Sequence, residues 1–121
     1  MSGSDFKSRT PFNRRQEEAI SIKQKYPERV PIICERASRN PDVPLIPKCK
    51  FLAPAHMTIG QFIYIIRRNL VLSPEKALFL FVSNSLPTTH TLMRELYADF
   101  ADEDGFLYIK YSGESVFGHF L

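Results

Sequence analysis

The sequence predicts one α+β domain, and three observations support this class. Segments with the apolar spacing of helices alternate with short apolar runs typical of strands. The 121 residues can bury one hydrophobic core without disulfide or metal support. The composition, 44% hydrophobic and 24% charged, is that of a globular protein. No apolar run approaches the roughly 20 residues that span a bilayer.

The first helix is expected between Thr10 and Pro27. Threonine is a good N-cap, and the following Pro11 suits the first helical position. Pro27 ends the helix, because the residue before a proline avoids the helical conformation. Within this segment the residues that recur at helical spacing are expected to share one face: Phe12, Gln16, Ala19, Ile20 and Lys23.

Two strands, residues 29–35 and 48–53, follow and are joined by a proline-rich loop. They pair most simply as a hairpin with a long connection. Pro31 inside the first strand predicts either an edge strand or a position without a ladder hydrogen bond. Alternation predicts two faces for the first strand, with Val30, Ile32 and Cys34 on one and Pro31 and Ile33 on the other.

The second half of the chain adds two helices and two strands. Thr58 and Gln61 fit a capping box and predict the start of a helix. The continuous apolar run of residues 77–82 predicts a central strand covered on both faces. A short helix at residues 92–100 and a last strand at residues 106–111 follow. The apolar stripes are Phe62, Ile63, Ile66 and Leu70 in the first helix, and Leu92, Leu96 and Phe100 in the second. The order, a helix and then ββαβαβ, is that of the β-grasp fold.

The charge is distributed unevenly along the chain. The net charge is +3, and the lysines and arginines concentrate in the first half. An acidic run lies in the second half, at Asp99, Asp102, Glu103 and Asp104. A basic half can bind phosphates, anionic lipid head groups or acidic peptides, although most of these charges are expected to form only a solvated surface.

Neither catalysis nor a cofactor is expected. Cys34 and Cys49 lack CxxC spacing and clustered histidines, so neither a disulfide framework nor a zinc site is predicted. Cys34, His56 and His90 match no catalytic motif, and we expect no enzyme activity. The polar N-terminus lacks the apolar stretch of a signal peptide, which favours a cytosolic location.

The C-terminus consists of Phe117-Gly118-His119-Phe120-Leu121. A glycine has no Cβ, so its backbone can pass through a narrow active site and then become an activated carboxyl group. The alternative is a disordered end that merely contains a glycine. The tail alone favours this alternative, and only the preceding β-grasp order gives Gly118 a context.

Several stretches in the same order match one known family: KYPERVPII at residues 25–33, TIGQF at 58–62, ALFLFVSN at 77–84, and GFLYI at 105–109 with the closing Phe117-Gly118. On these stretches the chain resembles the ubiquitin-like modifiers of autophagy, of the GABARAP and light-chain-three type, over essentially its whole length. Features of both branches are present, so the subfamily stays open.

The resemblance implies a helical pair in residues 1–26, a ubiquitin-like core in residues 27–117 and a processed tail in residues 118–121. A cysteine protease would cut between Gly118 and His119. Activating and conjugating enzymes would then join the glycine carboxyl group to phosphatidylethanolamine. The protein would be cytoplasmic when free and on the autophagosome membrane when lipidated.

The resemblance also implies a groove for aromatic-x-x-aliphatic motifs of cargo receptors and adaptors. The motif would add a strand beside residues 48–52, which needs no particular peptide sequence. Its pocket for the aromatic residue maps onto Glu18, Ile22, Pro31, Ile33, Lys50, Leu52 and Phe106. Its pocket for the aliphatic residue maps onto Phe51, Ala53, Pro54, Met57, Phe62, Ile65 and Ile66. Arg29 and Lys48 would border the groove and suit acidic flanking residues.

Two residues depart from the family pattern. Asn69 stands where a third basic residue is usual, and Ala53 is smaller than the usual valine, which would enlarge the aliphatic pocket. Two other functions remain alternatives. One is a ubiquitin-fold interaction domain that is never conjugated. The other is RNA binding through the alternating aromatic residues of 105–111, although an RNA-recognition motif has the order βαββαβ.

Overall fold

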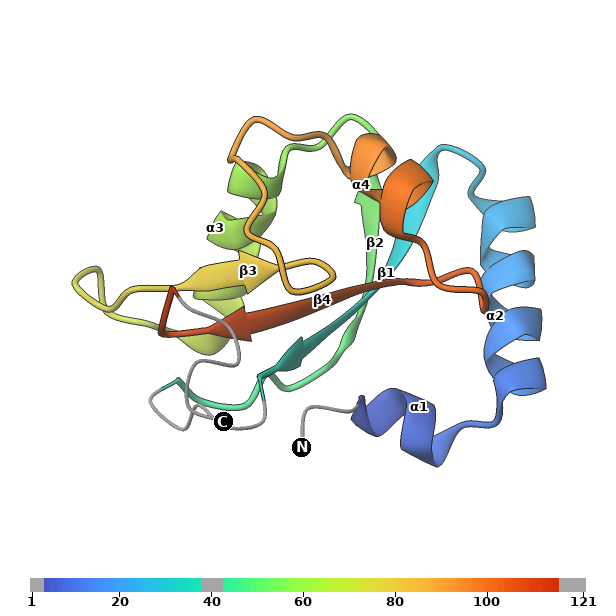
Figure 1. The fold of residues 1–121 in the computed structure, drawn as a ribbon, viewed down its shortest axis with the longest axis horizontal. Helices are drawn as coiled ribbons and strands as arrows, with labels where there is room; N and C mark the ends of the chain where they lie inside the picture. The colour runs from blue at the N-terminus through green and yellow to red at the C-terminus, as the bar shows by residue number, and fades with distance from the viewer. Residues whose placement is uncertain (1–3, 38–42, 116–121) are drawn as a thin grey trace.

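A mixed four-stranded sheet forms the centre of the computed structural model, which describes residues 4–37 and 43–115 (Figure 1). The strand order is β2-β1-β4-β3, and β1 and β4 pair in parallel while the outer pairs are antiparallel. The expected hairpin of the first two strands is therefore confirmed. The strands are β1 (Arg29–Arg36), β2 (Lys50–Pro54), β3 (Phe79–Phe81) and β4 (Leu107–Ser112).

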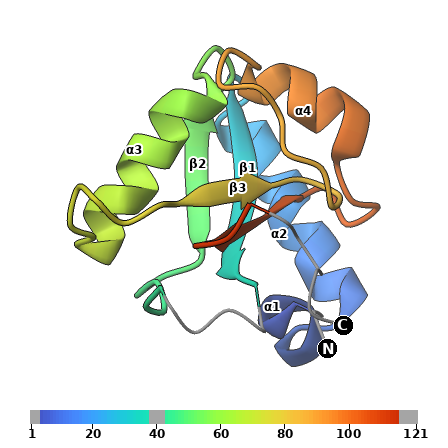
Figure 2. The same cartoon turned by 60° about the vertical axis from the view of Figure 1, so that its left-hand side comes forward.

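Helices cover both faces of the sheet. Figures 1 and 2 show α2 on one side of the sheet and α3 on the other. A smaller core lies under the N-terminal helices and includes Phe6, Ala19, Ile33 and Phe106. A larger core lies under α3 and α4 and includes Ile32, Phe62, Ile66 and Leu96. The helices are α1 (Asp5–Arg9), α2 (Phe12–Lys25), α3 (Ile59–Leu70) and α4 (Met93–Phe100).

The alternation predicted for β1 is confirmed. Val30, Ile32 and Cys34 belong to the larger core, and Ile33 belongs to the smaller one. The edge position that Pro31 suggested is wrong, because β1 is an internal strand. The alternative prediction, a position without a ladder hydrogen bond, fits. Pro31 lies opposite Leu52. Hydrogen-bonded and non-bonded pairs alternate along antiparallel strands, and the Cys34 amide donates to the Cys49 carbonyl (2.8 Å). Counting from that bonded pair, Pro31 and Leu52 form a non-bonded pair, so no ladder bond to β2 is lost there.

The prediction of a central strand at residues 77–82 is wrong. Only Phe79–Phe81 form a strand, and it lies at the edge of the sheet beside β4. Leu80 and Phe81 are both buried, so the apolar run does reflect cover on both faces. Burial of the faces does not fix how many hydrogen-bonded neighbours a strand has.

The ends and faces of the helices differ in detail from the expectation. The capping box of Thr58 and Gln61 is present, but Thr10 ends α1 and Pro11 is the N-cap of α2. In α2 the buried residues are Arg15 and Ala19, while Phe12 and Ile20 of the expected stripe are exposed. In α3 the expected stripe is buried or half-buried. In α4 the buried residues are Met93 and Leu96, and Phe100 is exposed.

A buried ion pair attaches α2 to the sheet. Arg15 Nε donates to Asp104 Oδ2 at 2.8 Å, and the Asp104 side chain is fully buried. Asp104 also accepts hydrogen bonds from the Phe106 amide at 2.9 Å and from the Tyr108 hydroxyl. These contacts hold the segment before β4 against the N-terminal helices.

Candidate functional site

The outer edge of β2 presents backbone groups for a further strand. In an antiparallel pair the hydrogen-bonded positions alternate. The bond between the Cys34 amide and the Cys49 carbonyl places the bonded positions of β2 at Phe51 and Ala53. The amide and carbonyl groups of Lys50 and Leu52 therefore point away from β1. This is the arrangement that an added strand requires.

A groove of about 520 Å³ follows this edge between α2 and α3. Leu52 lies opposite Pro31 and Lys50 opposite Ile33, so their side chains lie on the α2 face of the sheet. Phe51 lies opposite Ile32 and belongs to the α3 face. The groove thus has walls on both faces, formed by Ile22, Lys48, Lys50, Phe51, Leu52, Ile65, Asn69 and Phe106.

Most of the expected aromatic pocket is brought together here. Ile22, Lys50, Leu52 and Phe106 line the groove. Glu18 lies beside it, where its carboxylate forms an ion pair with Lys50 Nζ at 2.7 Å. Pro31 and Ile33 are buried and do not line the groove. They lie opposite Leu52 and Lys50 in the sheet, and they therefore support the groove from beneath.

The expected aliphatic pocket divides into three groups. Phe51 and Ile65 line the groove itself. Pro54 and Met57, again with Ile65, line an adjoining cavity of about 840 Å³. Ala53, Phe62 and Ile66 are buried members of the larger core, and Phe62 packs edge-to-face against Phe51 with ring centroids 5.5 Å apart. These three residues form support beneath the pocket rather than its wall.

The charged side chains that line the groove are basic, and one of them, Lys50, is paired with Glu18 at its margin. Among the described residues, its only charged lining side chains are Lys48 and Lys50. Lys48 Nζ lies 5.5 Å from the centre of the Phe51 ring, and Lys50 Nζ lies 5.2 Å from that of Phe6. Arg29 is exposed opposite Pro54 and does not line the groove. The positive charges at the rim therefore come from Lys50 of β2 and from Lys48, which precedes β2.

Asn69 lines the groove from α3. Its amide nitrogen donates to the Ile65 carbonyl at 2.9 Å, one helical turn earlier. The side chain therefore lies back along its own helix and adds no charge to the α3 wall.

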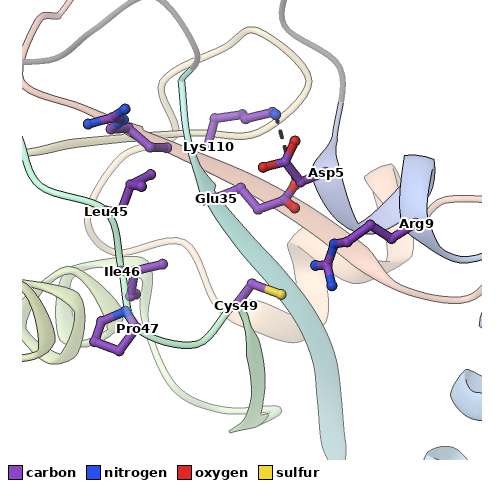
Figure 3. Close-up of a pocket in the computed structure, with 9 residues that line it drawn as sticks. Asp5, Arg9, Glu35, Leu45, Ile46, Pro47, Cys49 and Lys110 are labelled. Atoms are coloured by element: carbon purple, nitrogen blue, oxygen red, sulfur yellow. Dashed lines mark ion pairs between the residues drawn. The ribbon is translucent and has the colours of Figure 1, made fainter.

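A further pocket of about 450 Å³ lies upstream of β2 (Figure 3). Cys49 lies between the side chain of Arg9 and those of the loop that carries Ile46. Lys110 forms an ion pair with Glu35 at 3.9 Å, and Glu35 accepts a hydrogen bond from the Phe6 amide at 2.9 Å. The sequence did not predict this pocket, because it unites α1, β1, β4 and a loop that are distant along the chain.

The buried cluster of Arg15, Asp104 and Tyr108 was also missed. Its one signal in the sequence is the contrast between the basic first half and the acidic run of the second half, from which no charge pairing was predicted. Burial, with the hydrogen bond to Asp104, raises the pKa of Tyr108 above its ordinary value. The hydrogen bond to Asp104 raises the pKa of Arg15. Through the hydrogen bond from its amide to Asp104, the cluster also fixes Phe106, which lines the groove.

The aromatic side chains of residues 105–111 do not form a base-stacking surface. Phe106 and Tyr111 are 1% and 0% exposed. The half-buried Tyr108 has its hydroxyl committed to Asp104. Because β4 lies inside the sheet and is covered by helices, its rings pack in the protein. This disfavours RNA binding through that strand.

Cys34 lies in β1 as predicted, whereas Cys49 precedes β2, which begins at Lys50 rather than at Lys48. Cys34 is fully buried, Cys49 is half-buried, and both are free thiols. Burial raises the pKa of Cys34 far above its ordinary value. Within the described ranges there is no group of histidine, cysteine and acidic side chains that could hold a metal ion. Gly118 and residues 119–121 lie outside the described residues.

The sheet, its helices and the open edge of β2 together define a ubiquitin-like protein. The family described as "Autophagy protein Atg8 ubiquitin like" matches residues 14–118. The chain therefore belongs to the Atg8 family, and it is a ubiquitin-like modifier of autophagy. Membership associates it with a ubiquitin-like conjugation machinery and with partners in autophagy.

Similar proteins agree over nearly the full length. Autophagy-related protein 8d of Arabidopsis thaliana is 52% identical over 121 residues, with 100% of both chains covered. Autophagy-related protein 8 of Mycosarcoma maydis is 52% identical over 115 residues, covering 95% of this chain and 97% of the relative. The crystal structure of Trypanosoma brucei ATG8 superposes with a TM-score of 0.88 at 40% identity, covering 96% of this chain and 99% of that one. The resemblance and the β-grasp fold are thus confirmed.

In the described part of the chain, no helix has the length and apolar character to cross a membrane.

Proposed function

We propose that this modifier binds aromatic-x-x-aliphatic motifs of cargo receptors and adaptors in the groove along β2. One observation carries the proposal: the groove has apolar walls on the two opposite faces of an open strand edge. In an extended peptide, residues three apart point to opposite sides. An aromatic side chain would pack against Ile22 and Leu52 while the aliphatic one packs against Phe51 and Ile65.

Main-chain bonds and charge supplement these pockets. The outward amide and carbonyl groups of Lys50 and Leu52 would pair with the peptide backbone. Lys48 and Lys50 would attract acidic residues that flank the motif. Because the aromatic pocket lies near Lys50 and the aliphatic pocket extends to Met57, the peptide would run parallel to β2.

Leu52 and Lys50 should contribute to peptide binding in different ways. Leu52→Ala should cost about 1–2 kcal/mol of binding free energy at any salt concentration, because the contact is apolar. Lys50→Ala should cost less than about 1 kcal/mol, and the loss should shrink as salt screens the exposed charge. Calorimetry with an aromatic-x-x-leucine peptide at two ionic strengths measures both. Equal salt dependence for the two variants would contradict the assignment.

We further propose that Gly118 is the processing and lipid-attachment residue. The chain would not be an enzyme itself. A processing cysteine protease would remove residues 119–121, and activating and conjugating enzymes would attach the new carboxyl group to phosphatidylethanolamine. The chain would then be cytoplasmic when free and autophagosomal when lipidated. Support comes from the family membership, whose matched range ends at residue 118.

The substitution Gly118→Ala tests this second proposal. The added Cβ should crowd the scissile position, so cleavage by the family's protease should fall at least tenfold or stop. Intact-mass spectrometry would follow the loss of residues 119–121. A matched control is Gly113→Ala, five residues upstream, which should be cut like the wild type.

Membrane fractionation separates conjugation from the alternative of an unconjugated interaction domain. Wild-type protein from starved cells should partly sediment with membranes and carry the mass of a lipid on Gly118. A variant truncated before Gly118 should stay in the supernatant, because its only anchor would be covalent lipid. Equal sedimentation of both forms would reject the conjugation proposal and favour the unconjugated domain.

A further inference from the structure

The connection between α3 and β3 is an exposed segment of the surface. Figures 1 and 2 show it at the outside of the molecule, beyond the end of α3. The side chains of residues 73–77 are all exposed. The backbone bonds of this segment are local, since the Lys76 amide donates to the Ser73 carbonyl at 3.1 Å. Residues 73–77 can therefore open locally without disturbing the core.

The sequence of this connection includes Ser73-Pro74-Glu75-Lys76. A proline directly after the serine brings no amide hydrogen, and it favours the extended backbone at the serine in which protein kinases bind their substrates. A lysine three residues after the serine can pair with an acidic group of the kinase. These two features together form the substrate pattern of proline-directed kinases that also select a basic residue.

Arg67, in the last turn of α3, lies against this serine. Its Nη2 donates to the carbonyl groups of Ser73 at 3.1 Å and Pro74 at 3.3 Å, and also to that of Lys76. A guanidinium group carries five N–H donors, and among the described residues the Nε and Nη1 donors of Arg67 have no acceptor. The side chain is half-buried, which reduces the screening of its charge by solvent.

This arrangement provides a cation for a phosphate group on Ser73. The hydroxyl of a serine branches from the same Cα as its carbonyl, so a phosphate on the hydroxyl can reach a group that already binds the carbonyl. Guanidinium groups bind phosphate through paired, charge-assisted hydrogen bonds. The donors of Arg67 that do not hold the connection can therefore bind the phosphate while Nη2 keeps its carbonyl partners.

We propose that Ser73 is a phosphorylation site for a proline-directed protein kinase, and that Arg67 binds the resulting phosphate. The serine hydroxyl oxygen forms a bond to the γ-phosphorus of ATP, the bond from that phosphorus to ADP breaks, and the hydroxyl proton passes to the catalytic carboxylate of the kinase. The product carries about two negative charges at neutral pH. It fastens the connection to the end of α3. Neither peptide binding nor C-terminal processing is needed for this modification.

The chain contains a second site of the serine/threonine-proline type, Thr10-Pro11, which serves as an internal comparison. Three residues after the threonine stands Asn13 rather than a basic residue. Thr10 is half-buried at the end of α1, and its carbonyl accepts a hydrogen bond from Arg15 Nη1 at 2.6 Å. Opening this site would break a contact of the buried Arg15, so Thr10 should resist the kinase.

The first test incubates the full chain with a purified cyclin-dependent kinase, ATP and Mg²⁺. Peptide mass spectrometry should find phosphate on Ser73, and Ser73→Ala should abolish its incorporation. Lys76→Ala should slow the reaction several-fold, whereas the control Thr10→Ala should react like the wild type. Phosphate on neither residue, phosphate mainly on Thr10, or an unchanged rate in Lys76→Ala would overturn the inference.

The second test follows the phosphate of the phosphorylated protein by ³¹P NMR as pH changes. A neighbouring guanidinium group favours the dianion, so the pKa of phosphoserine 73 should lie below its ordinary value of about 6. Arg67→Gln should return the pKa towards that value, and Arg67→Lys should keep part of the lowering, which separates loss of charge from loss of fold. Arg68→Gln is the matched control, because the Arg68 guanidinium lies 5.8 Å from the centre of the Tyr64 ring. An ordinary pKa in the wild type, or the same lowering in Arg67→Gln, would rule out phosphate binding by Arg67.

Discussion

At the scale of single residues, the two thiols show how position on a strand sets reactivity. Cys34 is fully buried in β1 beside Ile32, whereas Cys49 is half-buried just before β2, between Lys48 and Lys50. Burial raises the pKa of Cys34, and only the thiolate reacts. Timed labelling of the native protein with a thiol reagent should therefore modify Cys49 first and Cys34 only on unfolding. Labelling of Cys34 before Cys49 would mean that the side chains of β1 face the opposite sides of the sheet.

At the scale of elements, α3 ends in a conformation that its residue disfavours. Val71 is the C-cap with φ 56° and ψ 45°, and it is 88% exposed. The left-handed region costs an L-residue roughly 1–2 kcal/mol, and glycine avoids this cost. Val71→Gly should therefore raise the free energy of unfolding by about 0.5–1 kcal/mol in urea titrations. Val71→Ala, which keeps the Cβ, is the control, and its free energy of unfolding should rise less. A glycine variant less stable than the wild type would contradict the backbone strain at Val71.

At the scale of the whole molecule, the N-terminal helices depend on one buried carboxylate. Asp104→Asn would leave Arg15 buried without its ionic partner, which should cost about 3–5 kcal/mol of unfolding free energy. Lys7→Ala breaks the exposed pair with Asp102 (2.7 Å) and should cost less than about 1 kcal/mol. Urea unfolding compares the two variants. Similar small losses would show that the N-terminal helices are held by their apolar contacts alone.

The buried pair of Arg15 and Asp104 also affects the groove. Asp104 fixes the Phe106 amide, and Phe106 lines the groove together with Ile22 of α2. Loosening the buried pair should therefore weaken peptide binding as well as stability. The stability of the fold and the shape of the aromatic pocket thus depend on the same contacts.

The sequence by itself determined the features that local chemistry controls. The capping box of Thr58, the alternation of β1 and the order of the elements follow from interactions between residues close along the chain. The residues of the groove were named through the family resemblance, and the structure brings Ile22, Lys50, Leu52 and Phe106 together. Periodicity alone could not separate such residues from ordinary core.

Tertiary structure alone decided what depends on contacts between distant segments. It placed β3 at the edge, because pairing with β4 is set by the packing of the whole sheet. It paired Arg15 with Asp104 across 89 positions of sequence, and it joined the groove to the cavity that carries His56 and His90. A residue's own neighbours determine its local conformation, but burial and charge pairing depend on which surfaces meet. These contacts between distant surfaces are fixed only when the complete chain packs.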